Sequence, residues 1–265
     1  MEVKNLEEKI KALLAKDRYD IDDLVDVVTV LRSENGCPWD KVQTHATIKK
    51  DLLEEVYEVM EAIDCDSPEM MREELGDVLL QVVFHTVIEE EKGSFVLEDV
   101  ITELCRKLIV RHPHVFGNVS ADTVDKVLSN WDAIKKETKG QESYTDTLKS
   151  VPKNFPALMR AQKLGKRAAR AGIDFHGGSE DGEAELIGAV RSALKQVEAD
   201  IADGREPSGD IGNLLMLCAN LARRCGCDAE EVLTGASNDL ISRFEGLEKS
   251  GRDLSAAAPG ELYAY

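Results

Sequence analysis

The chain has 265 residues, of which 43% are hydrophobic and 32% are charged, and its formal net charge is −18 at pH 7. The apolar fraction is sufficient for a packed core and excludes an intrinsically disordered chain, while the length allows one large domain or two of ordinary size. The acidic excess argues against a duplex nucleic acid as partner, because such a partner requires basic stripes.

Helical periodicity runs along nearly the whole chain. Alternation of β-branched residues is confined to a few positions, so no substantial sheet is expected. Breakers such as Asn35-Gly36-Cys37-Pro38 and Asp66-Ser67-Pro68 fall between the periodic segments, and Ser67 followed by Pro68 is a favourable helix start. The sequence therefore predicts an all-α protein. The predicted helices span residues 4–16, 22–33, 44–64, 67–91, 96–110, 121–138, 154–171, 183–203, 210–224 and 228–248.

Two of these helices each carry acidic side chains on one face. The acidic residues are Glu54, Glu55 and Glu58 on the first, and Glu73, Glu74 and Asp77 on the second. On a helix that turns about 100° per residue, each group of three lies within an arc of about 100°. The opposite faces are apolar, at spacings that bury one stripe against partner helices. These stripes are Leu53, Val56, Met60 and Ile63, and Leu75, Val78, Leu79 and Val82.

If the two helices pack side by side, their carboxylates form one cluster. Like charges at such spacings repel, and unpaired carboxyls that converge have raised pKa values unless a cation lies among them. A divalent metal would provide that cation. The alternative is that both acidic faces are simply solvated, which is the usual state of one isolated face of this kind.

The second half of the chain repeats the first in outline. Residues 158–175 correspond to residues 24–40, and the alignment places Asp210 opposite Glu74 and Asn213 opposite Asp77. The positions that match the acidic face of the first helix are Ser192, Ala193 and Gln196. Because the apolar pattern remains while the carboxylates are lost, this half is predicted to keep the fold without the metal site and to have no hydrolytic activity.

The predicted organisation has four parts. Residues 1–140 form the metal-binding domain, residues 141–152 a linker, residues 153–250 the degenerate repeat, and residues 251–265 a flexible tail. The six cysteines lack the paired spacing of a zinc site. The N-terminus has no apolar signal region, and no apolar run is long enough to span a membrane. A cytoplasmic protein without membrane partners is expected.

An ordered set of motifs resembles that of the MazG nucleoside triphosphate pyrophosphohydrolases, in their two-domain form. They lie in CPWDKVQTHATIKKDLLEEVYEVMEAI, REELGDVLLQVVFH, RHPHVFG and NWDAIKKE. The resemblance implies an all-α fold in which a four-helix bundle is completed by dimerisation. It also implies Mg²⁺, for which Mn²⁺ is a possible substitute, and hydrolysis of nucleoside triphosphates to the monophosphate and pyrophosphate.

The resemblance also implies roles for individual residues. The metal ligands are Glu55, Glu58, Glu74 and Asp77. The catalytic residues are Glu54 and Glu55, with Glu54 a candidate for holding or deprotonating the water, and Lys107 and Arg111, which contact the phosphates. The substrate-binding residues are Trp39, Asp40, Gln43 and Thr44 in the loop that approaches the base and sugar, and Trp131 and Lys135, which close the pocket.

Other functions agree with the same residues. The site could belong to a nucleotide-sensing or assembly protein that binds triphosphate and Mg²⁺ with little turnover, or the chain could be an all-α scaffold without a ligand. His85, in an apolar helix, is interpreted as a core residue rather than a ligand. The sequence does not specify which triphosphate is preferred.

Overall fold

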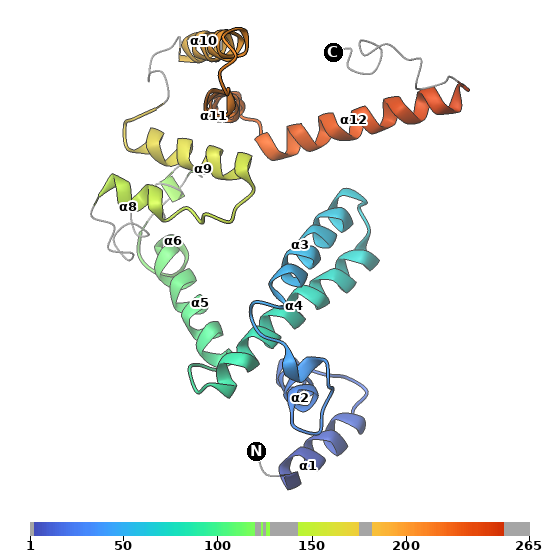
Figure 1. Cartoon of the computed structure of the whole chain (residues 1–265). Helices are drawn as coiled ribbons and strands as arrows, with labels where there is room; N and C mark the ends of the chain where they lie inside the picture. Colours follow the sequence, from blue (N-terminus) through green and yellow to red (C-terminus); the bar gives the residue numbers. More distant parts are fainter. Residues whose placement is uncertain (1–2, 120–122, 124–125, 128–142, 175–181, 252–265) are drawn as a thin grey trace. The chain divides into compact units, whose positions relative to one another are not determined.

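The computed structural model describes residues 3–119, 123, 126–127, 143–174 and 182–251. Every regular element in these ranges is a helix (Figure 1), which confirms the predicted all-α class. The chain forms two compact units, Met1–Lys135 and Lys136–Tyr265. No helix in the described ranges combines the length and the apolar character that a membrane span needs.

Unit 1 contains six α-helices and one short 3-10 turn among its described residues. They are α1 (Val3–Leu14), α2 (Ile21–Arg32), η1 (Asp40–Val42), α3 (Lys49–Asp64), α4 (Pro68–Glu91), α5 (Leu97–Arg111) and α6 (Pro113–Phe116). Helix α4 begins as predicted, because the Ser67 side chain accepts a hydrogen bond from the backbone N–H of Met70 and Pro68 occupies the first helical position. The predicted helix at 121–138 lies almost entirely outside the described residues.

Helix α3 begins at Lys49 rather than at residue 44 as predicted. The preceding residues form a separate turn, in which the backbone N–H of Thr44 donates to Thr47 Oγ1 at 2.9 Å and Thr47 Oγ1 donates to the Thr44 carbonyl at 2.9 Å. Threonine hydroxyls compete in this way with helical backbone bonds. Helical periodicity in the sequence does not reveal this competition, so the prediction placed the helix start too early.

The core of unit 1 lies where α2 and the C-terminal half of α4 meet. Val28 and Val83 are fully buried there, and Ile48, the residue before α3, is buried with them. Helices α3 and α4 are joined by a short turn at Asp66, which has a left-handed φ of 49°, and Figure 1 shows them side by side as a hairpin. This hairpin carries the acidic residues.

The predicted apolar stripes of α3 and α4 are not buried within one chain. Leu53 and Ile63 on α3 are more than half exposed, and so is Leu75 on α4. Helix α5 is similar, with Leu104 and Leu108 each 44% exposed. These apolar faces are therefore largely exposed among the described residues of unit 1.

Unit 2 repeats the helical hairpin. Its helices are α8 (Tyr144–Lys149), α9 (Ala157–Arg170), α10 (Gly182–Ala202), α11 (Ser208–Arg224) and α12 (Ala229–Lys249). Helices α10 and α11 pack against each other, and α9 packs on α11. The approach of α9 to α11 requires glycine at position 165, because a Cβ there would lie 1.8 Å from Oδ1 of the fully buried Asn220.

Part of the segment expected as a linker is helical. Helix α8 lies within residues 141–152, and Arg167 of α9 donates to the Thr147 carbonyl and to the Ser150 hydroxyl. Val151, just after α8, is 1% exposed. These residues therefore pack as part of unit 2.

Candidate metal centre

Glu55 occupies an interior position of the hairpin. The less exposed residues of α3 include Leu52, Glu55, Val59 and Ala62, a spacing of three and four residues that places them on one helix face. On α4, Glu74 and Asp77 are also only partly exposed. The carboxylates thus stand at positions that apolar side chains would occupy in an ordinary helical hairpin, which argues against a merely solvated acidic face.

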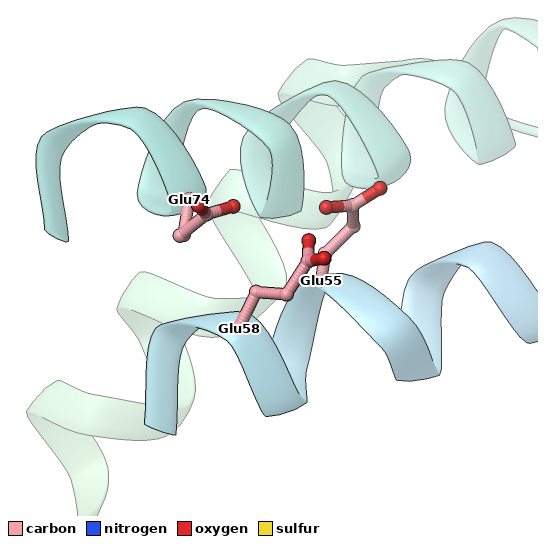
Figure 2. Close-up of side chains that lie close together, drawn as sticks. All are labelled: Glu55, Glu58 and Glu74. Carbon is pink, nitrogen blue, oxygen red and sulfur yellow. The ribbon is translucent and has the colours of Figure 1, made fainter. Parts of the chain in front are cut away.

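Three of the predicted ligands converge. Glu55 and Glu58 of α3 and Glu74 of α4 each contribute one carboxylate oxygen to a group in which all three oxygens lie within 4.8 Å of one another. Figure 2 shows the three side chains between the two helices, with Glu74 approaching from α4. Oxygen-only donors at this separation suit a hard divalent cation.

Without a cation, ionisation of the carboxyls in this cluster is unfavourable, as their pKa values show. The pKa of Glu55 is raised from 4.5 to about 7, first by burial, then by its hydrogen bond with Glu58 and by the negative charges of Asp77, Glu58 and Glu74. The pKa of Glu74 is raised as well, first by burial and then mainly by Glu58. Asp77 is not one of the three converging residues, but its charge acts on both of these carboxyls. A bound cation would reverse both shifts.

Gln81 adds a further acceptor near this face of α4. It is 8% exposed, and its Oε1 is buried without a hydrogen-bond partner. Because Gln81 follows Asp77 by four residues, the two side chains lie on the same side of the helix. Unpaired carboxylates and an unsatisfied amide oxygen are all acceptors, so the residues present fit a metal ion with its bound water.

The predicted phosphate-binding cations lie on α5. Lys107 is exposed and Arg111 is half-buried, and the main contacts of α5 are with α4 and α6. The charges that act most strongly on Glu55 and Glu74 are the neighbouring carboxylates rather than these two cations. Glu54 is exposed on α3 next to Glu55 and is not one of the three converging residues.

The predicted nucleoside-binding loop immediately precedes α3. Trp39 is 59% exposed, Asp40 begins η1, and Thr44 is exposed. The side-chain amide of Gln43 donates to the Trp39 carbonyl at 2.9 Å, so this amide N–H supports the loop itself. Trp131 and Lys135 lie outside the described residues.

A set of residues that was not predicted from the sequence holds this loop. Arg32, His45 and Glu89 bond the loop to α2 and α4, and His85, which was interpreted as a core residue, is bonded to His45 at 2.7 Å. His45 lies 40 residues from His85 and 44 residues from Glu89, and Arg32 reaches carbonyls 8 and 11 residues further along the chain. None of these separations follows from a helical spacing rule. A histidine within an otherwise apolar helix was the one available signal.

In unit 2, Arg205 of the connection between α10 and α11 is bonded to an acidic residue at the end of α10. Asp200, 5% exposed, accepts hydrogen bonds from Arg205 Nε and Nη2 at 2.8 and 2.7 Å. The pKa of Asp200 is lowered, first by its hydrogen bond with Asp210 and then by Arg205. Asp200 is therefore paired with a side-chain cation of the same chain, whereas the pKa of Asp210 is raised, first by its hydrogen bond with Asp200.

The fold and the site define an all-helical protein with a cluster of carboxylates that could hold a metal ion. A sequence profile of the MazG nucleotide pyrophosphohydrolase domain matches residues 43–116. The chain is 42% identical over 246 residues to the nucleoside triphosphate pyrophosphohydrolase of Escherichia coli (strain K12), which covers 88% of this chain and 92% of that protein. It is 40% identical over 228 residues to the nucleoside triphosphate pyrophosphohydrolase/pyrophosphatase MazG of Thermotoga maritima, with coverage of 86% and 85%. The chain belongs to the MazG nucleoside triphosphate pyrophosphohydrolase family.

Proposed function

We propose that this protein hydrolyses nucleoside triphosphates to the nucleoside monophosphate and pyrophosphate, and that the reaction takes place at the α3–α4 hairpin of unit 1. The convergence of Glu55, Glu58 and Glu74 is the observation that carries the proposal. The relatives bearing this activity in their names match the chain along most of its length. Unit 2, in which Asp210 alone remains of the matching carboxylates, is proposed to be inactive.

Glu55, Glu58, Glu74 and Asp77 are proposed to hold Mg²⁺, with Mn²⁺ as a possible substitute. The metal would neutralise charge on the phosphate oxygens and favour ionisation of a water near neutral pH. Glu54 or Glu55 would accept a proton from the attacking water. Lys107, Arg111 and Lys135 would bind phosphate oxygens, and Trp131 would help to close the pocket.

The loop before α3 is proposed to bind the nucleoside. Trp39 presents an exposed ring at the loop tip, and an aromatic ring can stack on any base. Polar groups of Asp40, Gln43 and Thr44 would contact the sugar and base edge. Stacking alone discriminates weakly among bases, so the preferred triphosphate depends on these polar contacts.

A homodimer is proposed as the active form. The exposed apolar stripes of α3, α4 and α5 need a partner to exclude water, and a second copy would supply two more helices for the bundle. Cytoplasmic location is proposed on the chemistry of the cysteines. All six are free thiols and five are exposed, which suits a reducing compartment.

The decisive experiment measures pyrophosphate release from a mixture of nucleoside triphosphates in the presence of Mg²⁺. Glu58→Gln and Asp77→Asn should each reduce the rate by about 100-fold or more, because loss of even an outer-shell group costs roughly 10- to 100-fold. Glu61→Gln is the matched control, since Glu61 is an exposed acid on the same helix and its loss should leave the rate unchanged.

Pyrophosphate release measured together with the melting temperature separates the alternative functions. Binding of nucleotide and Mg²⁺, seen as a raised melting temperature, without pyrophosphate release under any divalent metal would favour a nucleotide sensor. Neither binding nor release would favour a scaffold. Full activity in Glu58→Gln would refute the proposed metal site.

A further inference from the structure

The loop between α2 and α3 is tightly fitted to the end of α2. The backbone N–H of Cys37 donates to the Leu31 carbonyl at 2.8 Å. A Cβ at Gly36 would lie 2.2 Å from that same carbonyl oxygen, so only glycine fits there. The chain then forms η1 and reaches the buried Ile48, and between these two points the loop depends on side chains for its shape.

Arg32, the last residue of α2, supplies one set of these bonds. Its side chain is 5% exposed. Its Nη1 donates to the carbonyls of Asp40 at 2.8 Å and Gln43 at 3.1 Å, so one nitrogen binds both ends of the η1 turn. A buried cation that donates to two loop carbonyls fixes the shape of the loop. A segment that only connects two helices does not need such a bond.

The rest of the guanidinium is fixed by α4. Nε and Nη2 donate to Glu91 Oε1 and Oε2, each at 2.8 Å, and the guanidinium carbon lies 5.1 Å from the centre of the Phe84 ring. A two-pronged bond to a carboxylate together with stacking on an aromatic ring uses the planar shape of arginine. Lysine cannot reproduce this geometry.

A second set of bonds to α4 forms at His45, shortly after η1. His45 Nε2 lies 2.6 Å from Glu89 Oε1, and His45 Nδ1 lies 2.7 Å from His85 Nδ1. The pKa of Glu89 is lowered to about 2, first by its hydrogen bond with Lys92 and then by His45. Glu89 is therefore ionised and can only accept, so His45 Nε2 is the donor. Both anchors end on the last turns of α4.

This attachment fixes the distance between the loop and the acidic cluster. Asp77 and His85 are eight residues apart on one continuous helix, which corresponds to about 12 Å along its axis. The triphosphate would lie at the carboxylates and the nucleoside at the loop, and α4 sets the separation between them as a rigid element.

We propose that Arg32 is a positioning residue for the nucleoside part of the substrate. It holds the 39–44 loop in the shape that presents Trp39 and the polar loop residues, without touching substrate itself. This inference rests on the proposed function, since it takes the loop to bind the nucleoside. It assigns a specific role to a buried arginine that is not part of the metal or phosphate machinery.

The test uses the full-length protein with Arg32→Lys, which keeps the positive charge and loses the planar fork. Glu91→Gln is a milder second variant, because it leaves the two loop carbonyls bonded to Arg32. Arg18→Lys is the matched control, at an exposed arginine of the same unit. Circular dichroism establishes that each variant keeps its helical content.

Two readouts are compared. Hydrogen–deuterium exchange of the nucleotide-free protein should show faster uptake in the peptide that covers residues 37–48 for Arg32→Lys, with a smaller increase for Glu91→Gln and none for Arg18→Lys. Steady-state kinetics should show KM for the triphosphate raised about tenfold in Arg32→Lys, with kcat changed by less than about threefold. A merely structural defect would lower kcat in proportion to the folded fraction and leave KM unchanged.

Unchanged exchange in Arg32→Lys would overturn the inference, and so would faster exchange with an unchanged KM. Failure of the proposed function looks different, because the wild-type protein would then release no pyrophosphate at all. In that case exchange still decides whether Arg32 holds the loop, and nucleotide protection of the 37–48 peptide in the wild type decides whether the loop binds the nucleoside.

Discussion

The carboxyl of Glu55 makes metal binding depend on pH in the neutral range. With a pKa of about 7, raised first by burial, this group holds a proton at pH 6 and has lost it at pH 8. Because a ligand must be deprotonated to bind, displacement of one proton with this pKa should make the affinity for Mg²⁺ about tenfold weaker at pH 6 than at pH 8.

Calorimetry in two buffers with different ionisation enthalpies measures both the affinity and the number of protons released. We expect release of protons near pH 7 and a shift to tighter binding as the pH rises. Glu61→Gln should behave like the wild type. Binding with the same affinity at both pH values and no released proton would mean that Glu55 is not a ligand.

The contact between His45 and His85 predicts a second pH effect, on the loop. The pKa of His85 is lowered from 6.5, first by burial and then by the charge of His45. A lowered pKa means that the folded state disfavours protonation, so the stabilisation is present above about pH 6.5 and is lost as the pH falls below it. Two protonated rings would also present two donors to each other at 2.7 Å.

Between pH 7.5 and 5.5, we therefore expect faster hydrogen exchange in the loop peptide and a fall in melting temperature. The groups that surround this contact are His45 from the loop and Glu89 and Lys92 from the end of α4. His85→Phe removes the titrating ring, so its melting temperature should fall less than that of the wild type over the same range. Equal changes in both proteins would contradict this prediction.

At the scale of elements, the exposed stripes of α3 and α4 predict how the chain associates. Val56 is 41% exposed and Leu79 is 42% exposed. A lysine in the centre of an apolar interface leaves a buried, unpaired charge. Val56→Lys and Leu79→Lys should therefore convert a dimer into a monomer, as measured by size-exclusion chromatography with light scattering.

Leu14→Lys is the control for that experiment, because Leu14 is a large apolar residue of α1 that is 81% exposed outside these stripes. It should leave the association state unchanged. A wild-type protein that is monomeric at micromolar concentration would refute the proposed dimer, and a dimer that survives both lysine substitutions would place the interface elsewhere.

The helices themselves were predictable from the sequence to within a few residues for most elements, because each depends on local periodicity and capping. The predicted start of α3 was wrong because the hydroxyl of Thr47 forms hydrogen bonds with the backbone of Thr44, and these bonds make a separate turn before the helix. The hairpin was predictable for a related reason. The two acidic faces lie on successive helices with a short connection, which brings them together in the hairpin, although the apolar stripes expected to be buried are exposed.

The anchors of the loop were not predictable. Arg32 and Glu91 are 59 positions apart in the sequence, and their meeting depends on how α2 crosses the end of α4. Helical periodicity gives the face on which a residue lies but not which distant carbonyl or carboxylate faces it. The exposure of the apolar stripes was likewise not predictable, because periodicity shows that a helix has an apolar face but not whether another helix of the same chain covers it.

At the scale of the whole molecule, the two units share a hairpin and differ in how its charge is balanced. In unit 1 the pKa of Glu55 is raised, first by burial and then by the carboxylates around it. In unit 2 the pKa of Asp200 is lowered, with Arg205 among the causes. Arg205 thus places a cation of the same chain beside Asp200, whereas the pKa of Asp210 is raised, first by its hydrogen bond with Asp200.

This comparison predicts that unit 2 folds alone and is inactive, provided that the fragment begins early enough. A fragment of residues 143–251 retains α8, whose Thr147 and Ser150 accept from Arg167, and the buried Val151. A fragment of residues 153–251 lacks them and should be about 2 kcal/mol less stable, since burial of one valine alone contributes roughly 1.5–3 kcal/mol. Thermal unfolding followed by circular dichroism should show a melting temperature lower by several degrees for the shorter fragment.

Neither fragment should release pyrophosphate with Mg²⁺, and release from either one would show that the repeat kept a catalytic site without the carboxylates of unit 1.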